Sequence, residues 1–133
     1  PTSLLRGSGD LLLIYPAKLE APARRLAALR RSEGWDPRCV EAEELFNTFS
    51  YGRRDVRAVR ALLREAARRW RRSPRAVVLF GDATLDPRGY LAPPEEGMFP
   101  APRVDVFPME TVGDMGLGEC AGPGGRDVAV GRI

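Results

Sequence analysis

The stretch that decides the fold of this chain is Arg75-Ala76-Val77-Val78-Leu79-Phe80-Gly81-Asp82. Five apolar residues follow one another in it without polar alternation, which predicts a strand that is covered on both faces. Such strands are usually parallel to their neighbours and lie between helices. Gly81 relieves the backbone at the carboxyl end of the strand. Asp82 then places a carboxylate just outside the sheet, at the edge where open α/β sheets build their sites.

Further strand and helix patterns lie on both sides of this strand. Strand-like runs occupy 10–15, 38–40 and 127–133. In 103–107 polar and apolar residues alternate, as in an edge strand or the arm of a hairpin. Apolar residues recur at helical spacing in 19–33 and 55–70, which predicts two helices, and 41–46 is predicted to form a single helical turn. This order predicts one α/β domain over 1–133, with three αβα layers, a mainly parallel, doubly wound sheet and an irregular excursion over 83–126.

The helix predicted over 55–70 has two different faces. Asp55 is placed to cap it, and its apolar stripe consists of Val56, Val59, Leu63, Ala66 or Ala67, and Trp70. An adjacent face carries Arg57, Arg60, Arg64 and Arg68. A basic amphipathic helix can bind phosphate groups or anionic lipid. The commoner explanation of such a face is that it is simply solvated.

Composition limits the classes of protein. The hydrophobic content of 44% is that of a globular protein, and no apolar run approaches the ~20 residues of a membrane span. The net charge is +3, and arginine provides nearly all of the positive charge, since Lys18 is the only lysine. Arginine, alanine, glycine and proline abound together, as in GC-rich coding sequence, so the charge does not by itself predict a nucleic-acid partner.

The chain ends leave the cellular location open. Residues 1–9 lack the basic-then-apolar order of a signal peptide. The missing initiator Met and the end at Ile133 lead us to expect a piece of a longer chain. Export therefore cannot be read from this segment.

The sequence has no histidine. Ser-His-Asp and Cys-His catalysis are therefore excluded within the segment. Cys39 and Cys120 lie far apart without metal-ligand spacing, and buried thiols are expected, although an extracellular chain would permit one disulfide. Gly7-Ser8-Gly9 precedes a predicted strand, whereas the glycine motif of a dinucleotide-binding site follows a strand and opens a helix, so this motif does not predict dinucleotide binding. We predict no catalytic residue and no cofactor-binding residue here.

Acidic residues gather near the predicted carboxyl edge of the sheet. Together with backbone carbonyls they can supply the about six to eight oxygens that Ca²⁺ takes. No EF-hand spacing is present, and the alternative is that Asp82 and Asp86 cap turns. The calcium candidates are Asp82, Asp86, Asp105, Glu110 and Asp114.

Several spans together resemble the amino-terminal part of the gingipain-type cysteine peptidase catalytic domain, a caspase-like α/β family. They cover nearly the whole chain in the right order, and the most specific are the Phe-Ser-Tyr-Gly loop, the Gly-Asp strand end and the closing Ala-Val-Gly-Arg-Ile. The matching spans are 12–17, 30–34, 46–52, 55–70, 75–82, 86–90 and 127–133.

This resemblance implies a cysteine endopeptidase domain of two α/β subdomains side by side. In that family the catalytic His and Cys belong to the second subdomain, downstream of the closing Gly-Arg element, and neither Cys39 nor Cys120 matches the nucleophile. The segment is then a noncatalytic scaffold for that subdomain, and the whole protein acts on peptide or protein substrates. The resemblance also implies an extracellular or cell-surface location, and an exposed subdomain face would favour dimers.

The chain also departs from the family. Met109-Glu110-Thr111-Val112 stands where the family has a Ser/Thr-Asp pair followed by an aromatic residue, and Gly116-Leu117-Gly118-Glu119 replaces an Asp-Gly-Asp pattern. Family members can bind calcium in this general area, and these departures argue against it in this chain. These departures are also compatible with a noncatalytic relative of the family. The alternative function is a stand-alone binding module that uses the basic helix face.

Overall fold

A four-stranded parallel sheet forms the centre of the protein. The computed structural model describes residues 4–81, 83–84, 99–100, 103–106, 109–112 and 123–133. The strands of the sheet follow the order β2-β1-β3-β8, and every neighbouring pair is parallel. Their bounds are Leu11–Tyr15 for β1, Pro37–Glu41 for β2, Ala76–Leu79 for β3 and Ala129–Arg132 for β8. The predicted α/β class and doubly wound parallel sheet are confirmed.

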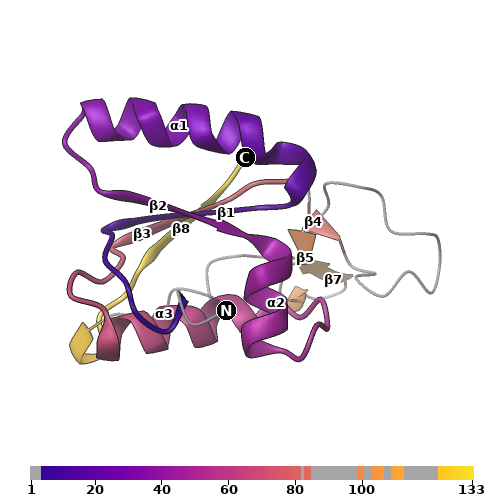
Figure 1. The fold of residues 1–133 in the computed structure, drawn as a ribbon. Coiled ribbons are helices and arrows are strands. Elements are labelled where there is room, and N and C mark those ends of the chain that lie inside the picture. Colours follow the sequence, from indigo (N-terminus) through magenta and orange to yellow (C-terminus); the bar gives the residue numbers. More distant parts are fainter. Residues whose placement is uncertain (1–3, 82, 85–98, 101–102, 107–108, 113–122) are drawn as a thin grey trace.

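Helices cover both faces of this sheet (Figure 1). One face packs against α1, and the other packs against α2 and α3. Because successive strand residues point to opposite faces, Leu12 and Ile14 of β1 join one core, whereas Leu11, Leu13 and Tyr15 join the other. The helices are η2 (Ala17–Leu19), α1 (Glu20–Ser32), α2 (Ala42–Phe49) and α3 (Arg57–Arg69).

The core under α2 and α3 is the larger one. It is built from buried aliphatic residues with Phe46 and Trp70, and its largest side chains are almost fully shielded from solvent. Each fully buried Leu or Ile in it contributes roughly 1.5–3 kcal/mol through removal of apolar surface from water. Trp70 also donates from its indole Nε1 to the carbonyl oxygen of Leu4 at 3.0 Å, which ties the start of the chain to the end of α3.

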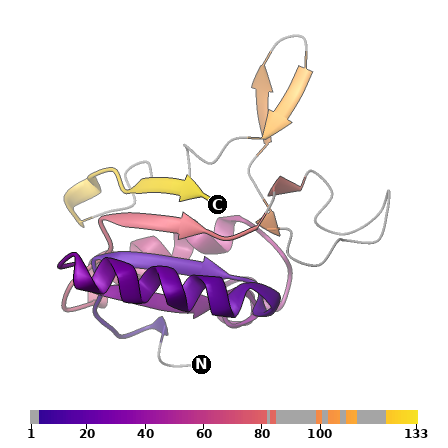
Figure 2. The same ribbon diagram turned by 90° about the horizontal axis from the view of Figure 1, so that it is seen from above.

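Short strands lie within the predicted excursion. β4 (Ala83–Thr84) pairs in parallel with β5 (Phe99–Pro100). β6 (Arg103–Val106) and β7 (Met109–Val112) form an antiparallel hairpin, which projects away from the main sheet (Figure 2). The hairpin agrees with the alternation noted at 103–107. Much of 83–126 lies outside the described residues, so the single-domain assignment and the bounds of the excursion stay predictions.

Three details differ from expectation. α2 has eight residues, not the single turn predicted over 41–46. The helical spacing of apolar residues in 19–33 predicts a buried stripe of Leu19, Ala23, Leu26 and Leu29 or Arg30, but Leu29 is 53% exposed and Ala27 is buried beside Ala23. η4 (Pro123–Gly125) is a short 3₁₀ turn within the segment predicted as a loop. In the part of the chain described, no helix has both the length and the apolar character to cross a membrane.

Candidate functional site

The carboxyl edge of the sheet is closed by backbone hydrogen bonds. The N–H of Phe80 donates to the carbonyl of Ile14 at 2.9 Å, and that of Gly81 donates to the carbonyl of Ile133 at 2.8 Å. Arg132 then donates from Nη1 to the carbonyl of Gly81 at 3.1 Å. Gly81 has a φ of 110°, which an L side chain rarely adopts. The Gly-Asp strand end and the closing Gly-Arg element are thus joined at one edge.

The acidic candidates for calcium are only partly visible. Asp105 and Glu110 are opposite each other in the β6–β7 hairpin. Asp82, Asp86 and Asp114 lie outside the described residues. Two carboxylate residues alone supply fewer oxygens than Ca²⁺ takes. Within the residues described, no group of three or more His, Cys, Asp or Glu side chains is placed to hold a metal ion. The calcium site stays a prediction.

Cys39 is a half-buried free thiol in β2. It packs against the core beneath α1. Burial raises the pKa of its thiol, and the smaller effects of Arg24 and Arg31 oppose that rise. A thiol with a raised pKa remains protonated at neutral pH and is a poor nucleophile. Cys120 lies outside the described residues.

The basic face of α3 is partly neutralised by neighbouring carboxylates. Arg57 forms a two-pronged ion pair with Asp55, with Nη2 at 2.8 Å from Oδ2 and Nε at 3.1 Å from Oδ1. Asp55 lies one residue before the N-cap Val56, and it accepts from the backbone N–H of Arg57, the first residue of α3, at 2.9 Å, so it satisfies a free N–H at the start of the helix. Arg69 of the same helix, which is not part of this face, pairs with Glu65 at 2.6 Å. Arg64 and Arg68 are exposed.

Comparison with known proteins decides the family. The family model described as "Peptidase family C25" matches residues 5–133. The chain belongs to peptidase family C25. This is the gingipain family, so the resemblance seen in the sequence is confirmed.

A solved structure supports the fold of this C25 chain. The crystal structure of dimeric latent PorU from Porphyromonas gingivalis matches with a TM-score of 0.70 and 26% identity. The match covers 94% of the C25 chain and 14% of the PorU chain, so the C25 chain spans a small part of that protein. No curated protein matches.

The turn between α2 and α3 of the C25 chain holds a feature that the sequence analysis missed. Tyr51 has a φ of 54°, and its side chain is 93% exposed. Ser50 holds the turn because its Oγ lies 3.0 Å from the carbonyl of Phe46, and Gly52 donates its backbone N–H to the same carbonyl. The sequence signal for this turn was the Tyr-Gly pair that follows the apolar positions of α2. Helices often end in a residue with left-handed backbone conformation, and this residue is usually glycine.

The amino edge of the sheet carries a second feature that the sequence analysis missed. A pocket of about 910 Å³ opens there between the α3–β3 connection and the segment before β8. Its lining includes Arg71, Arg72, Arg75 and Arg126. The first three arginines lie within the five residues 71–75, but Arg126 joins them only because β8 pairs with β3.

Proposed function

We propose that this chain is the noncatalytic amino-terminal subdomain of a gingipain-like cysteine endopeptidase. Its task is to pack against the downstream subdomain that carries the catalytic His and Cys, and to hold that site in a fixed geometry. The peptidase step of the whole protein is acyl transfer from a peptide or protein substrate to a thiolate that His activates. Membership of the family supports our further proposal that this activity lies outside the cell or at its surface.

The open face of β8 carries this proposal. β8 is an edge strand of the described sheet, and its α1-side residues, Ala129 and Gly131, are exposed. They share that face with Ala76 and Val78 of β3, with which they are in register. α1 lies over β1 and β2 and leaves this side of β8 uncovered by described residues (Figure 2). An exposed edge strand needs a cover or a partner to avoid unwanted pairing, and the catalytic subdomain would supply it.

Other observations agree with a scaffolding role. The described carboxyl edge is occupied by backbone hydrogen bonds and by Arg132, and the half-buried Cys39 keeps its proton. The segment has no histidine that would activate a thiol. The matched PorU structure is dimeric and latent, and we extend to this protein only the idea that the open β8 face also permits self-association.

The alternative, a stand-alone module that binds through the basic face of α3, has less support. Arg57 and Arg69 of α3 already bind Asp55 and Glu65, which reduces the free positive charge of the helix. Loss of nucleic-acid or anionic-lipid binding in R64A/R68A at low salt would favour this alternative over the scaffold.

The test of the scaffold uses the full protein that carries this chain. An added Cβ at Gly131 meets nothing within 4 Å among the described atoms, so G131E should fold. If the catalytic subdomain covers this face, the buried charge should lower kcat/KM on a thiol-dependent peptide assay at least tenfold. The matched control is A28E on the exposed side of α1, which should retain full activity. Unchanged kcat/KM in G131E contradicts the proposal.

A further inference from the structure

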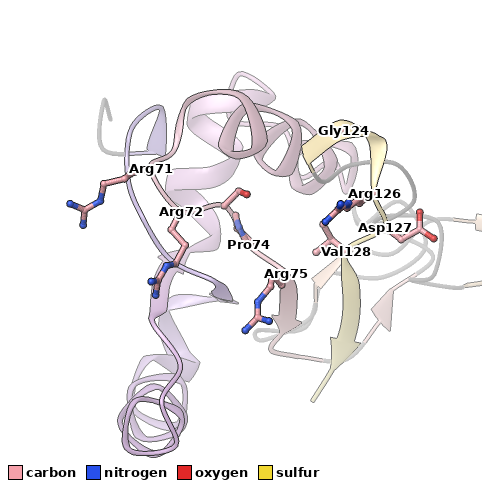
Figure 3. A pocket seen from close by; sticks show the side chains of 9 residues that line it. Arg71, Arg72, Pro74, Arg75, Gly124, Arg126, Asp127 and Val128 are labelled. Carbon is pink, nitrogen blue, oxygen red and sulfur yellow. The ribbon is translucent and has the colours of Figure 1, made fainter.

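The pocket at the amino edge of the sheet is separate from the carboxyl edge described above. Two chain connections form its walls: the segment between α3 and β3, and the segment from η4 into β8 (Figure 3). The residues that line it are Arg71, Arg72, Ser73, Pro74, Arg75, Gly124, Arg126, Asp127 and Val128. Because it lies at the opposite end of the strands, an inference about it does not rest on the proposed peptidase scaffold.

The walls carry a marked excess of positive charge. Four arginines line the pocket against one aspartate. The side chains of Arg72 and Arg75 extend in the same direction from one wall, and Arg126 belongs to the facing wall (Figure 3). The carboxylate of Asp127 points away from Arg72 and Arg75 (Figure 3). A ligand in the pocket therefore meets guanidinium groups from two sides.

The guanidinium groups of Arg72 and Arg75 form only long ion pairs with the described carboxylates. Arg72 and Arg75 share one oxygen, Oδ2 of Asp10, at 3.9 Å and 3.7 Å. Direct charge-assisted bonds are about 2.7–2.9 Å long, so both contacts are loose. The two side chains are 59% and 71% exposed. Arg75 also packs its guanidinium over the ring of Trp35, 4.9 Å from the centroid, which orients its planar donor face.

The floor of the pocket differs from its walls. Pro74 and Val128 are buried, and Val128 belongs to the main core. The pocket thus combines an apolar floor with cationic walls. A ligand that fits both has carboxylates beside an apolar side chain. A nucleic-acid backbone would leave this apolar floor unused.

We propose that this pocket binds an acidic peptide segment, with carboxylates on Arg72, Arg75 and Arg126 and an apolar side chain on the floor. Guanidinium groups suit this ligand because their planar donors match carboxylate oxygens in pairs. The site therefore serves as a docking point for an acidic, extended segment of a partner protein.

Fluorescence anisotropy tests the proposal directly. The probe is a short labelled peptide in which leucines alternate with aspartates and glutamates, titrated with the full protein at about 50 mM and about 300 mM salt. We expect the Kd to increase with salt, and to increase about tenfold when alanines replace the leucines. A peptide with asparagine and glutamine in place of the acids should not bind.

Two matched double variants locate the binding site. R72Q/R126Q removes two wall charges and should weaken binding of the acidic peptide at least tenfold. R25Q/R64Q removes the same charge from exposed positions of α1 and α3, outside the pocket lining, and should leave the Kd unchanged. The single variant R126Q should weaken binding in the same direction if the double variant fails to fold. In the unmodified protein, bound peptide should slow amide hydrogen exchange at 71–75 and 124–128.

Three results would overturn the proposal. The first is absence of acidic-peptide binding at the lower salt concentration. The second is equal binding by R72Q/R126Q and by R25Q/R64Q. The third is tighter binding of single-stranded DNA of matched charge than of the peptide, with a loss of DNA affinity only in R25Q/R64Q. This result would show that the exposed helix arginines, and not the pocket, bind the anionic ligand.

Discussion

The carboxylate of Asp10 accepts a hydrogen bond from the backbone N–H of Asp36 at 2.8 Å. The backbone of Asp10 continues the link, since its N–H donates to the carbonyl of Asp36 and its carbonyl accepts from the N–H of Arg75. One residue thus joins the amino ends of β1, β2 and β3. Asp10 is only 7% exposed, so the loss of its side chain leaves a shielded N–H without a partner.

We therefore predict that D10A lowers the free energy of unfolding by about 2–3 kcal/mol in urea denaturation. D10N keeps an oxygen acceptor for the N–H of Asp36 and should cost about 1 kcal/mol. The control is D36N, because the side chain of Asp36 is 48% exposed and its contact with Arg72 is 4.0 Å long. D36N should change stability by less than about 0.5 kcal/mol. Equal stability of D10A and D36N would refute the role assigned to Asp10.

The indole of Trp70 anchors the start of the chain. Its Nε1 donates to the carbonyl of Leu4, and Trp70 is only 6% exposed. W70F removes this donor and some buried volume, so we predict a loss of about 2 kcal/mol in unfolding free energy. Amide hydrogen exchange at residues 4–9 should accelerate more than exchange in β1. W35F, at a half-buried tryptophan, is the control and should leave exchange at 4–9 unchanged.

The ion pair between Asp55 and Arg57 predicts an acid-dependent stability. The side-chain hydrogen bond from Arg57 is the main cause that holds the pKa of Asp55 below its usual value of 3.8, against the opposing effect of burial. A carboxyl group with a lowered pKa stabilises the fold above its unfolded-state pKa, and this contribution is lost as the pH falls through the folded-state pKa. Unfolding free energy should therefore drop between about pH 5 and about pH 2.

D55N should show a smaller decrease over the same range, because its amide does not titrate. At pH 7 the variant should be less stable than the wild type by about 0.5–1 kcal/mol, since Asn remains a good cap but loses the charge. Parallel pH profiles of the two proteins in thermal melts would show that Asp55 does not carry the effect.

The thiol of Cys39 should react slowly in the folded protein. Burial raises the pKa of this thiol above its usual value of 9.0, and the thiolate is the reactive form. In a C120S background, we predict that alkylation by iodoacetamide at pH 8 is at least tenfold slower in the folded chain than in guanidinium chloride. The rate in the folded protein should still be increasing above pH 9. A folded-state rate equal to that of the unfolded chain would contradict the raised pKa.

The sequence predicted the centre of the sheet better than its margins. β1 is buried on both faces, and β3 is buried on one face and half-buried on the other, so the residues of both strands are apolar and easy to recognise. β2 has half-buried Arg38 and Cys39, and the strand was predicted two residues shorter than the structure has it. In α2 the apolar positions 42, 45, 46 and 49 have full helical spacing, but only 41–46 was predicted as helical, as a single turn.

The pocket could not be predicted from sequence spacing. Arg72 and Arg75 belong to the connection before β3, whereas Arg126 comes after the long segment that ends at η4. Only the parallel pairing of β3 with β8 brings these connections together. Such a pairing between distant segments has no local signal in the sequence, in contrast to the caps and turns that neighbouring residues determine.

Tyr51 provides the last prediction, because its backbone conformation is costly for a non-glycine residue. A φ of 54° brings Cβ close to the following carbonyl, and this strain amounts to roughly 1–2 kcal/mol. The side chain is 93% exposed and so gains little from burial. Y51N should raise the unfolding free energy by about 0.5–1 kcal/mol, because Asn tolerates this region, and the β-branched Y51V should lower it by about 1 kcal/mol. Y51F keeps the backbone preference and should match the wild type in urea denaturation. If Y51V is as stable as Y51F, the turn does not hold residue 51 in the left-handed region.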